Sequence, residues 1–256
     1  MTASHNKLEA MEMYCDAFRE LVNDRVSWGS LSTPAELLRL NSENDWSFIC
    51  VAMDILGDAT TALQNFAQFG LDGPTRYDNV GERYLRLYGL LSAAYTQQQA
   101  AHKLYKLVNC PSPKLVRDKF IKLTLRTLRH QLASHSLDYM GSDRKPSGAA
   151  FVPVRMELRG HNCSVTENRG DASKEYDLQE ALNQHCDALI SVLDTIYEKS
   201  YKTFFKANKD KQLIHENKLG ELRQVRDGAI VIHITSPNSD GTDKVLIISG
   251  RPKTGT

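Results

Sequence analysis

Cysteines are scarce in this sequence and none of them form a CxxC pair. Their number is odd, and they are widely spaced: Cys15, Cys50, Cys110, Cys163 and Cys186. No apolar run follows Met1, as it would in a secretory signal. These absences disfavour secretion and a disulfide framework, so we expect a location in the reducing cytoplasm.

Long apolar runs and an excess of one charge are also missing. The longest apolar stretch, residues 46–57, contains Asp54 and falls well short of the roughly 20 residues that span a bilayer. We therefore expect no transmembrane segment and no membrane partner. The 32 Lys and Arg residues nearly balance the 31 Asp and Glu residues, so total charge gives no argument for a nucleic-acid partner.

Several enzyme motifs are absent too. The sequence has no Gly-rich Walker loop, no GxGxxG after a strand, no GxSxG elbow and no HExxH, which excludes the enzyme classes that depend on them. Asp54 is the one acid inside an apolar run, where it suggests a capped or paired core acid rather than a catalytic carboxylate. We expect no metal and no other cofactor, because the candidate ligands lack a zinc-finger spacing. Those ligands are His161, Cys163, His185 and Cys186.

Length and composition are those of a folded protein. A chain of 256 residues with 41% apolar and 25% charged residues is near the globular average. Such a length corresponds to one or two domains and buries roughly 70–75% of the unfolded surface. No disulfide or metal is needed to stabilise a core of that size.

Apolar residues recur at intervals of three and four over most of the chain, which predicts amphipathic helices. Capping residues and the Gly and Pro clusters near Gly70 and Pro111 set the expected boundaries. The predicted helices cover 5–26, a short turn from 32–34, 44 or 45 to about 69, 79–108, 112–136 and 178–205, with a more polar helix to about 225.

Two β-hairpins are predicted outside these helices. Residues 151–158 and 162–167 have a β-like pattern on either side of a turn at Gly160, and residues 229–235 and 244–249 are β-branched runs around a turn. The expected fold class is therefore mainly α, an antiparallel helical bundle with small β-hairpin additions. The predicted parts are a helical bundle (1–136), a β-hairpin insert (137–173), closing helices (174–226) and a C-terminal β-hairpin or tail (227–256).

Charge is segregated along the chain despite the neutral total. Residues 8–58 carry ten acids against three arginines, whereas residues 114–130 carry six bases against Asp118. On one straight helix, four of these bases form a single stripe. The stripe consists of Lys119, Lys122, Arg126 and Arg129. The simpler interpretation of this stripe is a solvent-exposed helix face. The functional interpretation is a surface that binds successive phosphates of RNA. Residues 199–226 are also basic and would complete a groove if they adjoined this helix.

The segment 125–136 contains the most informative arrangement. On an ideal helix, Arg129 and His135 lie about 9 Å apart along the axis and flank the apolar face of Leu128 and Leu132. If that face packs against a two-fold mate, two arginines and two histidines converge in a composite site. Alternatively, His135 interacts with the helix dipole and Arg129 is a surface cation. Spacing alone favours this second interpretation.

Arg129 and His130, followed by His135, resemble the Arg-polar-x(4–6)-His signature of HEPN domains, small helical bundles of bacterial and archaeal defence and toxin systems. Residues 80–136 are also similar to uncharacterised bacterial HEPN-like proteins, through Gly81-Glu-Arg-Tyr-Leu-Arg-Leu-Tyr88 and Gln97-Gln-Gln99. The resemblance implies a dimer that cuts RNA without metal, with Arg129 and His135 as the catalytic pair and His130 at the polar position. Toxins paired with nucleotidyltransferases commonly have a tyrosine two residues after the histidine. This chain has Leu137 there, so it departs from the pattern of that group of toxins.

RNA cleavage of this kind suits the two residues. RNA supplies its own nucleophile, the 2′-OH, so the enzyme needs a proton carrier with a pKa of about 6.5 and a cation for the phosphorane. We therefore predict a metal-independent endoribonuclease of bacterial defence or toxin type, a homodimer with RNA and an antitoxin or other defence-system component as partners. Lys119, Lys122 and Arg126 are the predicted RNA-binding residues. Tyr84, Tyr88 and Tyr95 suit base stacking, although such a stripe is more often core.

Two alternatives remain open at this point. One is a non-catalytic HEPN-like interaction or nucleotide-binding module, in which the same Arg and His side chains bind a nucleotide or stabilise a dimer. The other is a plain helical scaffold. Burial of Arg129 and His135 separates them, because a nuclease needs both side chains in a solvent-filled basic cleft.

Overall fold

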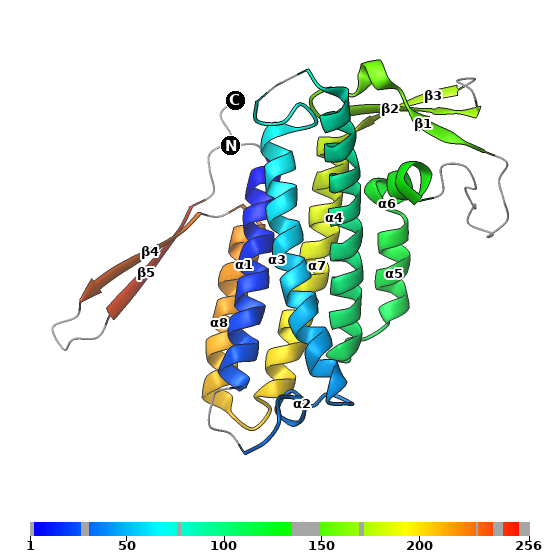
Figure 1. The fold of residues 1–256 in the computed structure, drawn as a ribbon. Helices are drawn as coiled ribbons and strands as arrows, with labels where there is room; N and C mark the ends of the chain where they lie inside the picture. Colours follow the sequence, from blue (N-terminus) through cyan, green and yellow to red (C-terminus); the bar gives the residue numbers. More distant parts are fainter. Residues whose placement is uncertain are drawn as a thin grey trace.

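The computed structural model of this chain describes residues 3–26, 31–75, 78–134, 149–168, 172–228, 230–237 and 243–250. It is mainly helical, and it carries a small three-stranded antiparallel sheet and a separate two-stranded one. Five long helices lie side by side and form the helical body (Figure 1). They are α1 (Ala3–Arg25), α3 (Asn44–Phe69), α4 (Val80–Leu107), α7 (Leu178–Phe204) and α8 (Lys209–Arg226). Their boundaries confirm the helices predicted from periodicity.

Local capping explains where several of these helices begin. The Asn79 side chain accepts hydrogen bonds from the first-turn amides of α4, and Asp177 and Asn208 do the same for α7 and α8. Such caps satisfy amide groups that have no partner within the helix. The short helix α2 (Pro34–Leu37) begins with a capping box formed by Thr33 and Glu36.

A glycine ends α3 and joins it to the three-stranded sheet. Gly70 has a φ of +59°, and a Cβ atom there would collide with the backbone of Gly160. The next amide, that of Leu71, donates a 2.7 Å hydrogen bond to the Gly160 carbonyl. Only glycine fits this close approach of two backbones.

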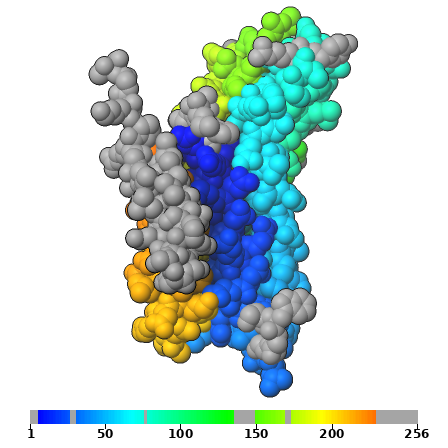
Figure 2. All heavy atoms as spheres, turned by 90° about the vertical axis from the view of Figure 1, so that its left-hand side faces the viewer, coloured from blue at the N-terminus to red at the C-terminus, as the bar shows by residue number. Residues whose placement is uncertain are grey.

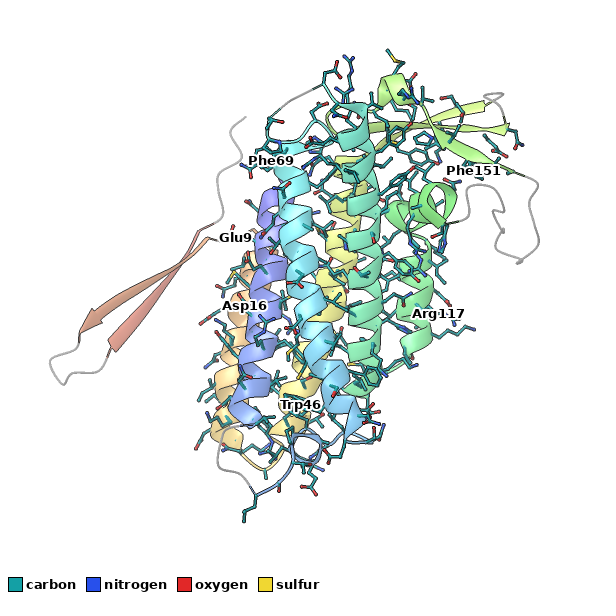
Figure 3. The ribbon with its side chains drawn as sticks, in the orientation of Figure 1. Glu9, Asp16, Trp46, Phe69, Arg117 and Phe151 are labelled. Carbon is teal, nitrogen blue, oxygen red and sulfur yellow. The ribbon has the colours of Figure 1, made fainter. Side chains whose placement is uncertain are left out.

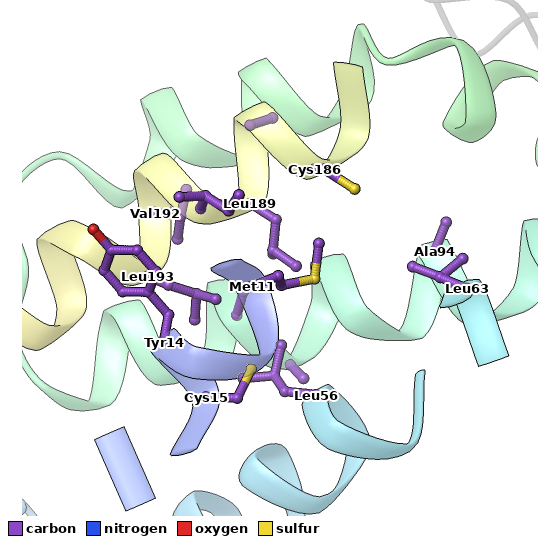
Figure 4. Packing of buried hydrophobic residues seen from close by; sticks show 14 of the residues in the cluster. Met11, Tyr14, Cys15, Leu56, Leu63, Ala94, Cys186, Leu189, Val192 and Leu193 are labelled. Atoms are coloured by element: carbon purple, nitrogen blue, oxygen red, sulfur yellow. The ribbon is translucent and has the colours of Figure 1, made fainter. Parts of the chain in front are cut away.

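The core lies between α1, α3, α4 and α7. Figure 4 shows Met11 and Tyr14 of α1 packed near Leu56 of α3 and Leu189 of α7, and all four are almost completely buried. Burying a side chain of this size stabilises the fold by about 1.5–3 kcal/mol. On the face drawn in Figure 2, α1 lies between α8 and α3.

Among the described helices, α3 is the one that is long and apolar enough to cross a membrane by length and composition. Sequence analysis expected no such segment. The buried side of α3, which includes Ile49, Leu56 and Leu63, packs against α1 and α4. The same helix also carries Phe48 and Val51, which are about half exposed.

The single helix predicted over 112–136 is wrong. The structure has α5 (Pro113–Ile121), a turn, α6 (Thr124–Leu128) and a π-helical turn, η1 (Arg129–Ser134). Leu123 is extended, with φ −69° and ψ 141°, and the chain changes direction there (Figure 1). The turn buries the aromatic Phe120, which is 3% exposed, and leaves Ile121 49% exposed. A straight helix would bury Ile121 on the Leu125 face and turn Phe120 away from it.

The first predicted hairpin belongs to a three-stranded antiparallel sheet. Strands β1 (Phe151–Pro153) and β2 (Asn162–Glu167) pair as expected, although a 3₁₀ turn, η2 (Arg155–Glu157), follows β1. Sequence analysis missed β3 (Ala172–Asp177), which pairs with β2 and crosses the boundary drawn at residue 173. Its polar and charged sequence has no apolar alternation.

The second predicted hairpin is confirmed. Strand β4 (Ile230–Pro237) pairs with β5 (Asp243–Gly250) in antiparallel register. This hairpin follows α8 and projects from the helical body in Figure 1.

Candidate functional site

Buried leucines of α6 and η1 place two arginines against α4. Leu125, Leu128 and Leu132 belong to the core and are at most 5% exposed. The intervening Arg126 and Arg129 are half-buried and lie over the ring of Tyr95 on α4. Strand β1 contacts η1, so the small sheet lies beside this region, as the position of Phe151 in Figure 3 shows.

The four side chains Tyr95, Arg126, Arg129 and His130 form what we call the arginine cluster. The guanidinium carbons lie 4.2 Å (Arg126) and 3.7 Å (Arg129) from the Tyr95 ring centroid, within the range of cation–π contacts. Arg126 Nε donates a 3.0 Å hydrogen bond to His130 Nε2. The His130 ring stands edge-on to Tyr95, with centroids 6.5 Å apart.

Neither arginine of the cluster has a carboxylate partner within the described ranges. The other five buried or half-buried arginines of that part of the chain each bond a carboxylate or a backbone carbonyl; they are Arg19, Arg25, Arg83, Arg86 and Arg223. Burial lowers the pKa of the Arg126 guanidinium, and repulsion from Arg129 acts in the same direction. Among the described residues, the cluster therefore holds two positive charges close together with no carboxylate paired to either.

The chain segment that carries the cluster is rich in bases, although one of them, Arg83, pairs with Asp72 and Asp78. Residues 83–134 contain ten Lys and Arg residues and a single acid, Asp118, which pairs with the neighbouring Arg117. Figure 3 shows Arg117 pointing outward from α5, on the opposite side of the helical body from Glu9 and Asp16 of α1. A cavity of about 20 Å³, room for about one water molecule, lies between α4 and α5. Its lining consists of Gln98, Gln99, His102, Arg117, Phe120, Ile121 and Arg126.

The predicted basic stripe is not continuous. Lys119 and Lys122 are exposed at the end of α5, whereas Arg126 and Arg129 follow the turn at Leu123 and lie against α4. Because the chain changes direction between the two pairs, the helical spacing of three and four residues does not put them on one face.

The predicted groove between the two basic segments is wrong. Helix α8 packs against α1 and α7, on the opposite side of the helical body from α5 (Figure 1). Several of its bases are also paired with acids: Arg223 with Asp194 and Glu198, and Lys211 with Asp24.

The expected spacing of Arg129 and His135 on an ideal helix involves a residue that the structure does not describe. His135 lies outside the described residues, and the segment leading to it, Arg129–Ser134, is π-helical. Single π-helical turns are frequent at functional sites. The apolar face of Leu128 and Leu132 is buried within the chain itself, so it gives no argument for a second copy. The homodimer therefore remains a prediction.

His130 was predicted among the catalytic residues. Its Nε2 atom accepts the hydrogen bond from Arg126, so in this arrangement the lone pair of that nitrogen is not available to take a proton. The ring orients the Arg126 guanidinium instead.

The three tyrosines expected to form one stripe lie in two separate places in the structure. Tyr95 lies within the arginine cluster, while Tyr84 and the exposed Tyr88 contact each other with ring centroids 6.0 Å apart. Asp54, expected to be a capped or paired core acid, is paired, with Arg19 Nη2 3.7 Å from its Oδ1, but its side chain is exposed and lies outside the core.

The four predicted candidate metal ligands do not come together. In the described part of the chain no three His, Cys, Asp or Glu side chains are placed to hold a metal ion. His161 lies against the Phe66 and Ala67 carbonyls, and burial raises the pKa values of the Cys163 and Cys186 thiols to about 12.

Sequence analysis missed a set of buried polar residues next to the arginine cluster. Gln98 Oε1 accepts a 3.4 Å hydrogen bond from Arg126 Nη1, and its Nε2 lies 3.2 Å from Nδ1 of His185, which is completely buried. The signal was present, since Gln97 and Gln98 both interrupt the apolar positions of a long predicted helix. Sequence alone could not show that both glutamines are buried, because that depends on the helices that pack around α4.

Comparison with protein-family models, curated proteins and solved structures finds no match to this chain. No known relative therefore assigns a role to the arginine cluster, and its chemistry has to be argued from its own geometry.

Proposed function

We propose that the arginine cluster binds a phosphate group of RNA. The observation that carries this proposal is the pair of half-buried guanidinium groups without a carboxylate partner in the described residues. Two like charges held at one tyrosine ring repel each other, and a phosphate would relieve that repulsion by accepting hydrogen bonds from both. The basic composition of residues 83–134 favours a polyanion over a single small anion.

The proposed activity is that of a metal-independent endoribonuclease of bacterial defence or toxin type, with an HEPN-like helical bundle as its fold. In this reaction Arg129 stabilises the charge on the phosphorane, and His135 moves the proton of the 2′-OH. The 2′-oxygen attacks the adjacent phosphorus and expels the 5′-oxygen, which leaves a 2′,3′-cyclic phosphate and a 5′-hydroxyl. The proposal retains the expected homodimer, the cytoplasmic location and a defence-system partner.

A second candidate function is a non-catalytic module that binds RNA or a nucleotide. The hydrogen bond from Arg126 to His130 favours it, because this histidine then serves binding and not proton transfer. Both candidates use the same arginine cluster, and they differ in whether bound RNA is cut.

The test is incubation of total RNA with the purified protein in the presence of EDTA, followed by analysis of the product ends. Wild type should cut and leave cyclic phosphate ends, and a substrate with a 2′-deoxy sugar at the cut should resist. His135→Ala should lose about 10²–10⁴ in rate while it still binds RNA. Lys206→Ala, which removes an exposed charge at the α7–α8 turn, is the matched control and should cut normally.

Binding measured in parallel separates the two candidates. If wild type binds a fluorescein-labelled RNA through Arg129 but never cuts it, the binding module is the correct function. Cleavage that requires a divalent metal and leaves 5′-phosphates would contradict the proposed mechanism. RNA affinity that is unchanged in Arg129→Ala would remove both candidates.

A further inference from the structure

A chain of buried hydrogen bonds connects the arginine cluster to the core between α3, α4 and α7. It starts at Arg126, whose Nη1 donates to Gln98 Oε1, and continues through Gln98 Nε2 to His185 Nδ1. The other ring nitrogen, His185 Nε2, lies 2.8 Å from Gln97 Oε1. Gln97 Nε2 then donates to the Leu56 carbonyl at 3.2 Å.

The two ends of this chain determine the direction of every hydrogen bond in it. At the inner end, the Leu56 carbonyl can only accept, so the Gln97 atom facing it is the amide nitrogen and Gln97 Oε1 faces His185. His185 Nε2 must therefore carry the proton. At the outer end, Arg126 can only donate, so the oxygen of Gln98 faces it.

The remaining contact fits this assignment. Burial lowers the pKa of His185 to about 4, so the ring is neutral at pH 7 and carries one proton, on Nε2. Its Nδ1 atom then accepts from the Gln98 amide nitrogen. A reversed Gln98 amide would place its nitrogen, a donor, against the donating Arg126 Nη1. It would also place its oxygen against the lone pair of His185 Nδ1, so His185 prevents that rotation.

From this we infer that Gln98 and His185 are positioning residues that hold the Arg126 guanidinium in place for the phosphate. The inference rests on the proposed function, because it assigns a role to residues that serve the same cluster. A guanidinium that is already held loses less conformational freedom when the ligand arrives, which increases affinity. Tyr95 and His130 hold the same side chain from the outer side.

The first test compares Gln98→Leu, Arg126→Met and the double variant, with a fluorescein-labelled single-stranded RNA as the probe. Gln98→Leu should weaken binding about fivefold, which corresponds to the net contribution of about 1 kcal/mol of a typical hydrogen bond. The double variant should bind no more weakly than Arg126→Met, because Gln98 acts only through Arg126. Tyr14→Phe is the control for general destabilisation, since it removes a buried hydrogen bond to Asp194 far from the cluster and should leave affinity unchanged.

The second test uses the ¹⁵N NMR signals of the His185 ring in wild type and in Gln98→Leu. Wild type should show the neutral tautomer with the proton on Nε2, and added RNA should shift the Nδ1 signal. A histidine that serves only to fill the core would not respond to a ligand at the surface. In Gln98→Leu the shift should disappear, while RNA still binds.

The outcomes separate this inference from the function on which it rests. RNA affinity unchanged in Arg126→Met would overturn the proposed role of Arg126, and the positioning role with it. If Arg126→Met weakens binding but Gln98→Leu does not, or if RNA leaves the His185 signals of wild type unmoved, the positioning inference is wrong and the binding site stands.

Discussion

Replacing Gln98 by glutamate would give Arg126 a carboxylate partner, which no described residue provides. The Gln98 oxygen lies 3.4 Å from Arg126 Nη1, and at that distance two unit charges attract by about 5 kcal/mol at an effective dielectric constant of about 20. Desolvation of a carboxylate at the buried position 98, solvent around the half-buried Arg126 and lost side-chain freedom reduce the net gain to about 1.5–3 kcal/mol. Since about 1.4 kcal/mol corresponds to a tenfold change, RNA affinity should fall about 10- to 100-fold.

The same substitution should change how stability depends on pH. In wild type the pKa of His185 is lowered to about 4 by burial, so the unfolded chain binds a proton at a higher pH than the folded one. Stability from this group is therefore lost as the pH falls from about 7 to about 4, by about 3 kcal/mol. A carboxylate at position 98 favours a protonated His185 and raises its pKa. The Gln98→Glu variant should therefore lose less stability than wild type over the same pH range.

Two measurements check these expectations. Fluorescence anisotropy at low salt and pH 7 gives the affinity for labelled RNA, and urea unfolding at a series of pH values gives the stability difference. The control is Gln98→Leu, which removes the amide without adding a charge and should weaken binding only about fivefold. If Gln98→Glu binds RNA as well as Gln98→Leu does, the uncompensated charge of Arg126 is not what attracts RNA.

Three further predictions concern stability and charge. Asp194→Ala should cost about 3–4 kcal/mol in urea unfolding, because it leaves the buried Tyr14 hydroxyl without its acceptor and removes one of the two carboxylates that pair with Arg223. Since the pKa of Asp194 is below its ordinary value, this difference should persist at neutral pH and shrink only below about pH 4; an unchanged difference in acid would contradict it. Leu128→Ala should cost about 2–5 kcal/mol without altering the elution volume in gel filtration, because Leu128 packs within its own chain; a change of oligomeric state would refute that. Lys122→Ala should leave stability nearly unchanged and reduce the slope of log affinity against log salt by about one. If its slope equals that of the control Lys206→Ala, Lys122 does not contact RNA.

The long helices were predictable from sequence because their signals are local. Apolar residues at three- and four-residue spacing, capping side chains such as Asn79 and a terminating Gly70 act within one or two turns of the backbone. The same holds for the strands β4 and β5, whose β-branched residues surround a turn sequence. In contrast, β3 has no apolar signal of its own and is a strand because β2 pairs with it.

The break between α5 and α6 shows where local signals stop being sufficient. Periodicity alone is consistent with one straight helix whose buried face includes Ile121. The turn at Leu123 buries Phe120 instead, and the advantage depends on the space that α4 and α7 leave for an aromatic ring. As a result, Lys119 and Lys122 are separated from the two arginines with which sequence had grouped them.

By itself, the sequence determined that this protein is mainly helical, where most helices begin and end, and that residues 114–130 and 199–226 are rich in bases. Only the tertiary structure decided which side chains meet. Gln98 reaches Arg126 across 28 positions and His185 across 87, and the Leu128 face turns into its own core. The physical reason is range: helix and turn preferences depend on neighbouring residues, whereas the pairing of a charge or a buried amide depends on distant segments that folding brings together.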